Sequence, residues 1–110
     1  MVVSTSRQAS QVGIDILNKG GNAVDAAVAV GFTLAVTSSS NGNIGGGGFM
    51  VARFEDGKTF SLDYREMAPQ AAFKDIFLDS AGNVINGKST RTHFASGVPG
   101  SVDGLLKAWK

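Results

Sequence analysis

The chain has 110 residues and a mass of 11.3 kDa, which is room for one small domain. Its 10 lysines and arginines nearly balance 9 aspartates and glutamates, and the formal net charge of +1 argues against a basic nucleic-acid-binding surface and against an acidic disordered tail. There is no cysteine, which excludes disulfides, thiolate zinc sites and cysteine nucleophiles. Glycine, with 15 residues, is well above its average share of about 7%.

Neither a targeting segment nor a membrane span is expected. The first three residues lead directly into polar ones, without the charged and apolar regions of a signal peptide. The longest apolar stretch, residues 23–36, includes Asp25 and Thr33 and is shorter than the roughly 20 residues that a membrane span needs. We therefore interpret it as a buried helix.

Two helices are predicted near the start of the chain, after a short strand over residues 2–5. Apolar residues spaced three and four apart predict a helix over 6–19, which Gly20 and Gly21 end. Asn22 then caps a second helix over 22–37, and Asp25 in its first turn complements the free amides. This second helix is apolar nearly all round, so we expect it to need cover on every side.

A β-hairpin is predicted over residues 49–66, because two alternating runs flank the turn signal at Asp56 and Gly57. Alternation divides the second run into two faces. One face carries Phe60, Leu62 and Tyr64, and the other, polar face carries Ser61, Asp63 and Arg65.

After Pro69, the pattern predicts a short helix over 70–77, turns at 81–83 and 86–87, and a last helix that Ser101 caps. No linker composition divides the chain into two domains. The last helix presents Leu105, Leu106 and Trp109 only two turns before the final residue, so we expect the chain to be a piece of something larger.

Four successive glycines, residues 45–48, invite comparison with nucleotide-binding loops. A phosphate loop needs a lysine and a Ser or Thr that open a helix, and a dinucleotide fingerprint runs from strand to glycines to helix. Here a helix precedes the glycines and a strand follows them, which argues against nucleotide binding. We interpret the glycines as letting the backbone pass close to other backbone.

Three single side chains are candidates for function. By position alone, Arg65 favours a surface ion pair with Asp63 or Glu66, and the alternative is a guanidinium fork that holds a carboxylate. His93 has no second histidine, which argues against a metal site and favours a loop histidine with a structural hydrogen bond. Thr92 is rejected as an N-terminal nucleophile, because residues 95–100 cannot form the buried strand that should follow it.

Four blocks of the sequence resemble the γ-glutamyltransferases, also called γ-glutamyl transpeptidases or glutathione hydrolases. They are QVGIDIL (11–17) with KGGNAVDAAVA (19–29), LAVT (34–37) with GNIGGGGFM (42–50), DYREMAP (63–69) and ASGVPG (95–100). The blocks fall in the family's order and spacing and span nearly the whole chain. One segment departs from the family pattern: residues 38–41 read SSSN where the family usually has a stretch with histidine and proline.

The resemblance implies an α+β fold of the N-terminal nucleophile hydrolase type, an αββα sandwich. Residues 1–110 would be the N-terminal segment of the large subunit, an incomplete domain that contains helices 6–19 and 22–37, hairpin 49–66 and the helix from 101. In that family a precursor cuts itself into two subunits, and the new N-terminal threonine of the small subunit attacks the γ-glutamyl amide. The glutamyl group then passes to water or to an amino acid or peptide.

The resemblance also sets expectations for sites and partners. It implies no catalytic residue, metal or cofactor in this chain, so the segment alone is predicted to be inactive. The implied partners are a γ-glutamyl substrate such as glutathione, the remaining large-subunit sequence and the small subunit of the same precursor. The implied compartment is periplasmic or extracellular.

Arg65 matches the arginine that holds the α-carboxylate of the γ-glutamyl group in the family, and the resemblance therefore favours a binding role over a surface ion pair. Two other functions stay open at this point. One is a related cephalosporin acylase-like amidohydrolase, which shares these blocks, and the other is a non-catalytic remnant domain that keeps the motifs.

Overall fold

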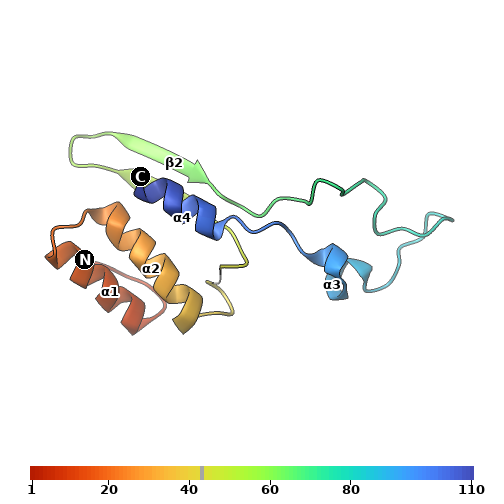
Figure 1. Ribbon diagram of the computed structural model, residues 1–110, viewed down its shortest axis with the longest axis horizontal. Coiled ribbons are helices and arrows are strands. Elements are labelled where there is room, and N and C mark those ends of the chain that lie inside the picture. The colour runs from red at the N-terminus through yellow and green to blue at the C-terminus, as the bar shows by residue number, and fades with distance from the viewer. Residues whose placement is uncertain (43) are drawn as a thin grey trace. The chain divides into compact units, whose positions relative to one another are not determined.

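Two helices, α1 (Arg7–Asn18) and α2 (Ala23–Thr37), come first in the computed structural model, which describes residues 1–42 and 44–110 (Figure 1). The described residues group into two compact units, Met1–Glu66 with Pro99–Lys110, and Met67–Val98. No linker-like composition marks this division.

Local capping explains where both helices begin and end. Ser6 caps α1, and its hydroxyl oxygen accepts a hydrogen bond from the Ala9 amide at 3.3 Å. Gly20 has φ 89°, the left-handed conformation that ends α1 without strain. At the start of α2, the Asn22 side chain accepts from the Asp25 amide at 3.0 Å, and the Asp25 carboxylate accepts from the Asn22 amide at 2.8 Å. The two predicted helices are confirmed, together with the predicted end of the first at Gly20 and the predicted cap of the second at Asn22.

The predicted hairpin is also confirmed, with strands β1 (Phe49–Arg53) and β2 (Thr59–Asp63). They pair antiparallel, from Phe49 opposite Asp63 to Arg53 opposite Thr59. Gly57 in the connecting turn has φ 85°. The last helix, α4 (Ser101–Trp109), lies between α2 and the hairpin (Figure 1).

The core of the first unit lies where α2, α4 and the hairpin meet. Its buried centre is Val24, Val28 and Leu105, and its partly buried margin is Phe32, Met50, Ala52, Phe60 and Ala108. Cover on α2 is incomplete, since Val36 near its end is 82% exposed. Part of the apolar surface of α2 therefore has no cover within the described chain.

Two predictions about the first unit were wrong. Residues 2–5 form no strand, because β1 and β2 pair only with each other and the Val2 side chain packs toward Gly13 of α1 and Val30 of α2 instead. Ser101 is the first residue of α4 rather than its cap, and Gly100 occupies the cap position. Contacts with distant residues accompany both differences: Val2 packs toward the two helices, and the Gly100 and Ser101 amides donate to the Gly46 carbonyl.

The second unit, Met67–Val98, consists mainly of turns. Its regular elements are a one-turn helix α3 (Lys88–Arg91) and a short 3₁₀ helix (His93–Ala95), with isolated bridges that join Met67 to Val98 and Leu78 to Val84. Gly82 and Gly87 have positive φ, which confirms the two predicted turns.

The helix predicted over residues 70–77 is absent. This stretch makes successive β-turns, in which Ala72 N–H donates to the Pro69 carbonyl at 2.8 Å and Ile76 N–H donates to the Phe73 carbonyl at 3.1 Å. Phe73, which would lie on the apolar face of such a helix, is 65% exposed. A helix this short is marginal without a packed face, and Phe73 does not provide one.

Among the described residues, no helix combines the length and apolar character required to cross a membrane.

Candidate functional site

Arg65 lies immediately beyond the paired part of the hairpin. The ladder continues one residue past β2, where the Tyr64 amide donates to the Gly48 carbonyl at 2.9 Å and the Gly48 amide donates to the Tyr64 carbonyl at 3.3 Å. The Arg65 amide then donates to the Asp63 carboxylate at 3.0 Å. Three hydrogen bonds therefore hold the backbone that leads into Arg65.

The alternation predicted for the second strand is confirmed. The residues on the face of Phe60, Leu62 and Tyr64 are partly buried, and those on the polar face, which includes Arg65, are exposed. The Arg65 side chain therefore points away from the core of the first unit.

The Arg65 guanidinium has two neighbours on the surface. Its Nε lies 3.8 Å from Glu66 Oε2, and the two side chains are 65% and 39% exposed. Its central carbon lies 5.9 Å from the centroid of the Phe49 ring. Both contacts are weak at an exposed site, so the guanidinium is available to a stronger anionic partner.

Sequence reasoning missed Phe49 as a neighbour of Arg65. The hairpin register contains the signal: Phe49 is directly opposite Asp63, on the outward face that Arg65 shares, and diagonal neighbours on one face are within reach of aromatic and long side chains.

The glycine-rich loop connects α2 to β1, in the predicted order of helix, glycines and strand. Its Asn43 lies outside the described residues. The interpretation of close backbone passage is confirmed for Gly47: a Cβ placed there would lie 2.7 Å from both the Arg65 Cα and the Glu66 amide nitrogen. The Gly46 carbonyl accepts from the Gly100 and Ser101 amides at 2.9 and 3.0 Å.

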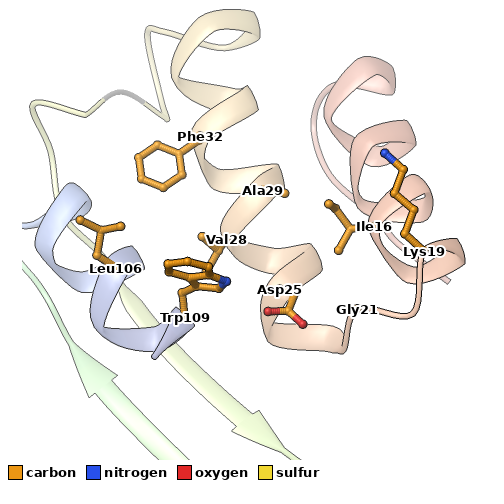
Figure 2. Close-up of a pocket in the computed structure, with 9 residues that line it drawn as sticks. All are labelled: Ile16, Lys19, Gly21, Asp25, Val28, Ala29, Phe32, Leu106 and Trp109. Atoms are coloured by element: carbon orange, nitrogen blue, oxygen red, sulfur yellow. The ribbon is translucent and has the colours of Figure 1, made fainter.

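A separate groove of about 450 Å³ lies among α1, α2 and α4. Figure 2 shows Leu106 and Trp109 of α4 beside Val28 and Phe32 of α2, with Lys19 at the edge. Asp25, which also lines the groove, is held in the capping box of α2. The lining is therefore mainly apolar and lacks the cluster of polar groups that usually orients a small ligand.

Other polar residues have local structural roles. The Thr92 hydroxyl donates to the Lys88 carbonyl at 2.6 Å. The His93 ring lies 4.1 Å from the Phe94 ring, and among the described residues this contact takes the place of the side-chain hydrogen bond that we expected. The part of the chain that the structure describes has no cluster of three His, Cys, Asp or Glu that is suited to a metal ion.

Two carboxyl groups have a shifted pKa, both at turns. A hydrogen bond from the Asn83 amide is the main cause that lowers the pKa of Asp79, and a hydrogen bond with the Lys58 side chain lowers the pKa of Asp56. Both groups are on the surface and stabilise loops, so neither has the raised pKa expected of a general acid.

Comparison with known proteins places the chain in a family. The sequence profile of the gamma-glutamyltranspeptidase family matches residues 9–110. The chain is 58% identical over 108 residues to the glutathione hydrolase proenzyme of Escherichia coli K12. Among solved structures, the γ-glutamyltranspeptidases of Helicobacter pylori and of Pseudomonas nitroreducens, the latter complexed with L-DON, match with TM-scores of 0.92 and 0.90 at 48% and 52% identity. The chain therefore belongs to the gamma-glutamyltranspeptidase family.

These matches cover nearly all of this chain but only a part of each relative. The Escherichia coli match covers 98% of this chain and 19% of that protein. The two structural matches cover 97% of this chain and 31% and 32% of theirs. The expected fold class is confirmed, with the helices and the hairpin forming part of the N-terminal nucleophile hydrolase fold.

Proposed function

We propose that this chain is the N-terminal segment of the large subunit of an enzyme that cleaves γ-glutamyl amides such as glutathione. The enzyme transfers the glutamyl group to water or to an amino acid or peptide. The observation that carries the proposal is the family match over residues 9–110, which includes the DYREMAP motif and its exposed arginine.

In this proposal Arg65 binds the α-carboxylate of the γ-glutamyl group. A guanidinium presents its donors in a fixed fork that matches the two oxygens of a carboxylate. The exposure of Arg65 and its 3.8 Å pair with Glu66 support this role, because an incoming carboxylate displaces only a weak surface contact. The Phe49 ring, whose centroid lies 5.9 Å from the central carbon of the guanidinium, leaves it equally accessible because such a contact is weak at an exposed site.

The bond-breaking step belongs to groups outside this chain. A threonine at the start of the small subunit attacks the γ-glutamyl carbonyl, the amide C–N bond breaks, and the amine leaves with a proton, which gives an acyl-enzyme. Water or an acceptor amine then attacks the ester, which releases the glutamyl group and restores the threonine hydroxyl. This chain contributes substrate binding through Arg65 and part of the scaffold. The proposed partners are therefore the remaining large-subunit sequence and the small subunit. The proposed compartment is the periplasm or the outside of the cell, as the resemblance implies.

A chimera tests this proposal. The segment of the Escherichia coli glutathione hydrolase proenzyme that matches this chain is replaced by residues 1–110. The same proenzyme with the segment deleted is the matched control. Self-cleavage is followed on gels, and turnover by the release of p-nitroaniline from γ-glutamyl p-nitroanilide. We expect the chimera to cleave itself and to turn over the substrate, and the control to do neither.

Two outcomes contradict the proposal. A chimera that cleaves itself but acts on a cephalosporin side-chain amide and not on the γ-glutamyl anilide indicates an acylase. A chimera that neither cleaves itself nor turns over any substrate indicates a remnant domain.

A further inference from the structure

Two glycines lie against the backbone around Arg65. A Cβ at Gly47 would lie 2.5 Å from the Tyr64 carbonyl oxygen and 2.7 Å from the Arg65 Cα. A Cβ at Gly100 would overlap the same Tyr64 carbonyl oxygen and lie 2.9 Å from the Arg65 carbonyl oxygen. Real Cβ atoms do not approach other atoms this closely, so both positions require glycine in this geometry.

The ring of Tyr64 is held in the same way by two further glycines. A Cβ at Gly48 would lie 2.9 Å from Tyr64 Cε2, and a Cβ at Gly104 would overlap Tyr64 Cβ and Cγ. Gly48 precedes β1, and Gly104 is a buried residue of α4. The Tyr64 side chain therefore joins the end of the hairpin to the last helix.

Hydrogen bonds join the same segments of the chain. The Gly46 carbonyl accepts from the Gly100 and Ser101 amides, which joins the glycine-rich loop to the start of α4. Gly48 and Tyr64 exchange two backbone hydrogen bonds. The segment Tyr64–Arg65 is thus held both by the glycine-rich loop and by the start of α4.

We propose that Gly47, Gly48, Gly100 and Gly104, here named the glycine cradle, are positioning residues that fix the direction of the Arg65 guanidinium. This inference rests on the proposed role of Arg65 in carboxylate binding. The Arg65 side chain is 65% exposed and its side-chain contacts are weak, so its direction depends mainly on its backbone. Direct contact with the Tyr64–Arg65 backbone, or with the ring attached to it, is what the four glycines share.

The cradle explains the choice of glycine at two distant places in the sequence. Residues 47 and 48 belong to the four-glycine loop, and residues 100 and 104 flank the start of α4. A methyl group at any of them pushes against the Tyr64–Arg65 segment, and the resulting shift moves the guanidinium away from the substrate carboxylate. A misplacement of about 1 Å in a binding group costs on the order of a hundredfold in rate at most, so a partial shift is expected to cost about tenfold.

The test uses the chimera described above and two substrates. One is γ-glutamyl p-nitroanilide, and the other is γ-aminobutyryl p-nitroanilide, which has the same chain without the α-carboxylate. The measured quantity is kcat/KM for the γ-glutamyl substrate divided by kcat/KM for the γ-aminobutyryl substrate. KM, kcat and the extent of self-cleavage are measured as well. Gly104→Ala is expected to lower the ratio about tenfold through a higher KM for the γ-glutamyl substrate.

A milder variant covers the case in which Gly104→Ala does not fold. In Gly48→Ala the new methyl meets the far end of the Tyr64 ring, which is able to shift, so we expect a selective loss of about threefold with normal self-cleavage. Gly31→Ala is the matched control, because its Cβ would meet the methyl groups of Leu105 at 3.1 and 3.2 Å and does not approach Tyr64. Its ratio is expected to stay unchanged.

Arg65→Lys is measured beside these variants. It distinguishes failure of the glycine cradle from failure of the proposed binding role of Arg65. If Arg65→Lys lowers the ratio and self-cleaved Gly48→Ala does not, the glycine cradle has no positioning role and the inference is refuted. If neither lowers the ratio, the role of Arg65 in the proposed function fails as well. Equal losses for both substrates in Gly104→Ala and Gly48→Ala contradict the inference, because they indicate a structural role only.

Discussion

Replacement of Arg65 by lysine separates a binding role from a structural one. Lysine keeps the positive charge but loses the fork that binds both oxygens of a carboxylate. Hydrogen bonds to charged groups contribute about 1.5–3 kcal/mol, and about 1.4 kcal/mol corresponds to a tenfold change. In the chimera we therefore expect Arg65→Lys to lower kcat/KM for γ-glutamyl p-nitroanilide about ten- to a hundredfold.

A structural role would give a much smaller effect. The pair with Glu66 is long, at 3.8 Å, and joins groups that are 65% and 39% exposed. Such pairs contribute about 0–1 kcal/mol, and lysine retains part of that. The contact with the Phe49 ring contributes on the order of 0.5–1 kcal/mol at an exposed site. The loss of these contacts would also be felt equally by every substrate.

The assay compares kcat and KM for the γ-glutamyl anilide and for the γ-aminobutyryl anilide, which has no α-carboxylate. Arg65→Ala should cost more than Arg65→Lys on the first substrate, because the carboxylate then enters without a counter-charge. The second substrate should be nearly indifferent to both changes. Self-cleavage should also persist, since it involves no substrate carboxylate. Equal losses on the two substrates in a normally processed chimera would refute the binding role.

Further predictions concern the isolated chain, the Asn22 helix cap and the Asp79 turn. Residues 1–110 alone should release no p-nitroaniline from γ-glutamyl p-nitroanilide, and turnover that a point mutation in this chain abolishes would contradict this. The isolated chain should be marginally stable or aggregate, whereas a sharp, cooperative thermal transition of a monomer would speak against it. In the chimera, Asn22→Ala should lower the free energy of unfolding in urea by about 1 kcal/mol, and Asn22→Gly by only about a few tenths, because glycine is tolerated at a helix N-cap; equal losses would argue against the capping box. The pKa of Asp79 is lowered in the folded chain, so the ionised carboxylate stabilises the 79–83 turn above pH 3.8, the unfolded value, and this stabilisation is lost as pH falls through the folded pKa. The NMR signal of the Asn83 backbone amide should follow this titration. In Asp79→Asn the same signal should show no such titration.

Features set by neighbouring residues were predictable from the sequence. The caps at Asn22 and Gly20 need only residues within one helical turn, and the hairpin turn at Gly57 needs a local positive φ. Alternation predicted the two faces of the second strand, and the strand–turn pattern placed Arg65 on the polar face.

Features set by distant contacts were not predictable. Residues 2–5 have a strand-like composition, but the Val2 side chain packs toward Gly13 of α1 and Val30 of α2, and β1 and β2 pair only with each other. Residues 70–77 have helical spacing, but no packed face supports a helix there. The binding role of Arg65 follows from a family resemblance. The contacts of Gly100 and Gly104 with Tyr64 depend on the packing of α4 against the hairpin, which no local pattern in the sequence indicates.

The exposed apolar surface of the first unit connects the proposed function with the expected low stability of the isolated chain. Phe49 and Val51 on the outward face of the hairpin are 64% and 82% exposed, and Trp109 on α4 is 62% exposed. Exposed apolar surface of this kind usually marks an interaction site or a tendency to aggregate. The relatives are several times longer than this chain, so their additional sequence is the natural source of cover in our proposal. Phe49 also neighbours Arg65, so we expect cover on this face to order the guanidinium and to remove water from its pair with the substrate carboxylate. In our proposal, stability and substrate binding in this segment are therefore both expected to depend on cover over the exposed surface formed by Phe49, Val51 and Trp109.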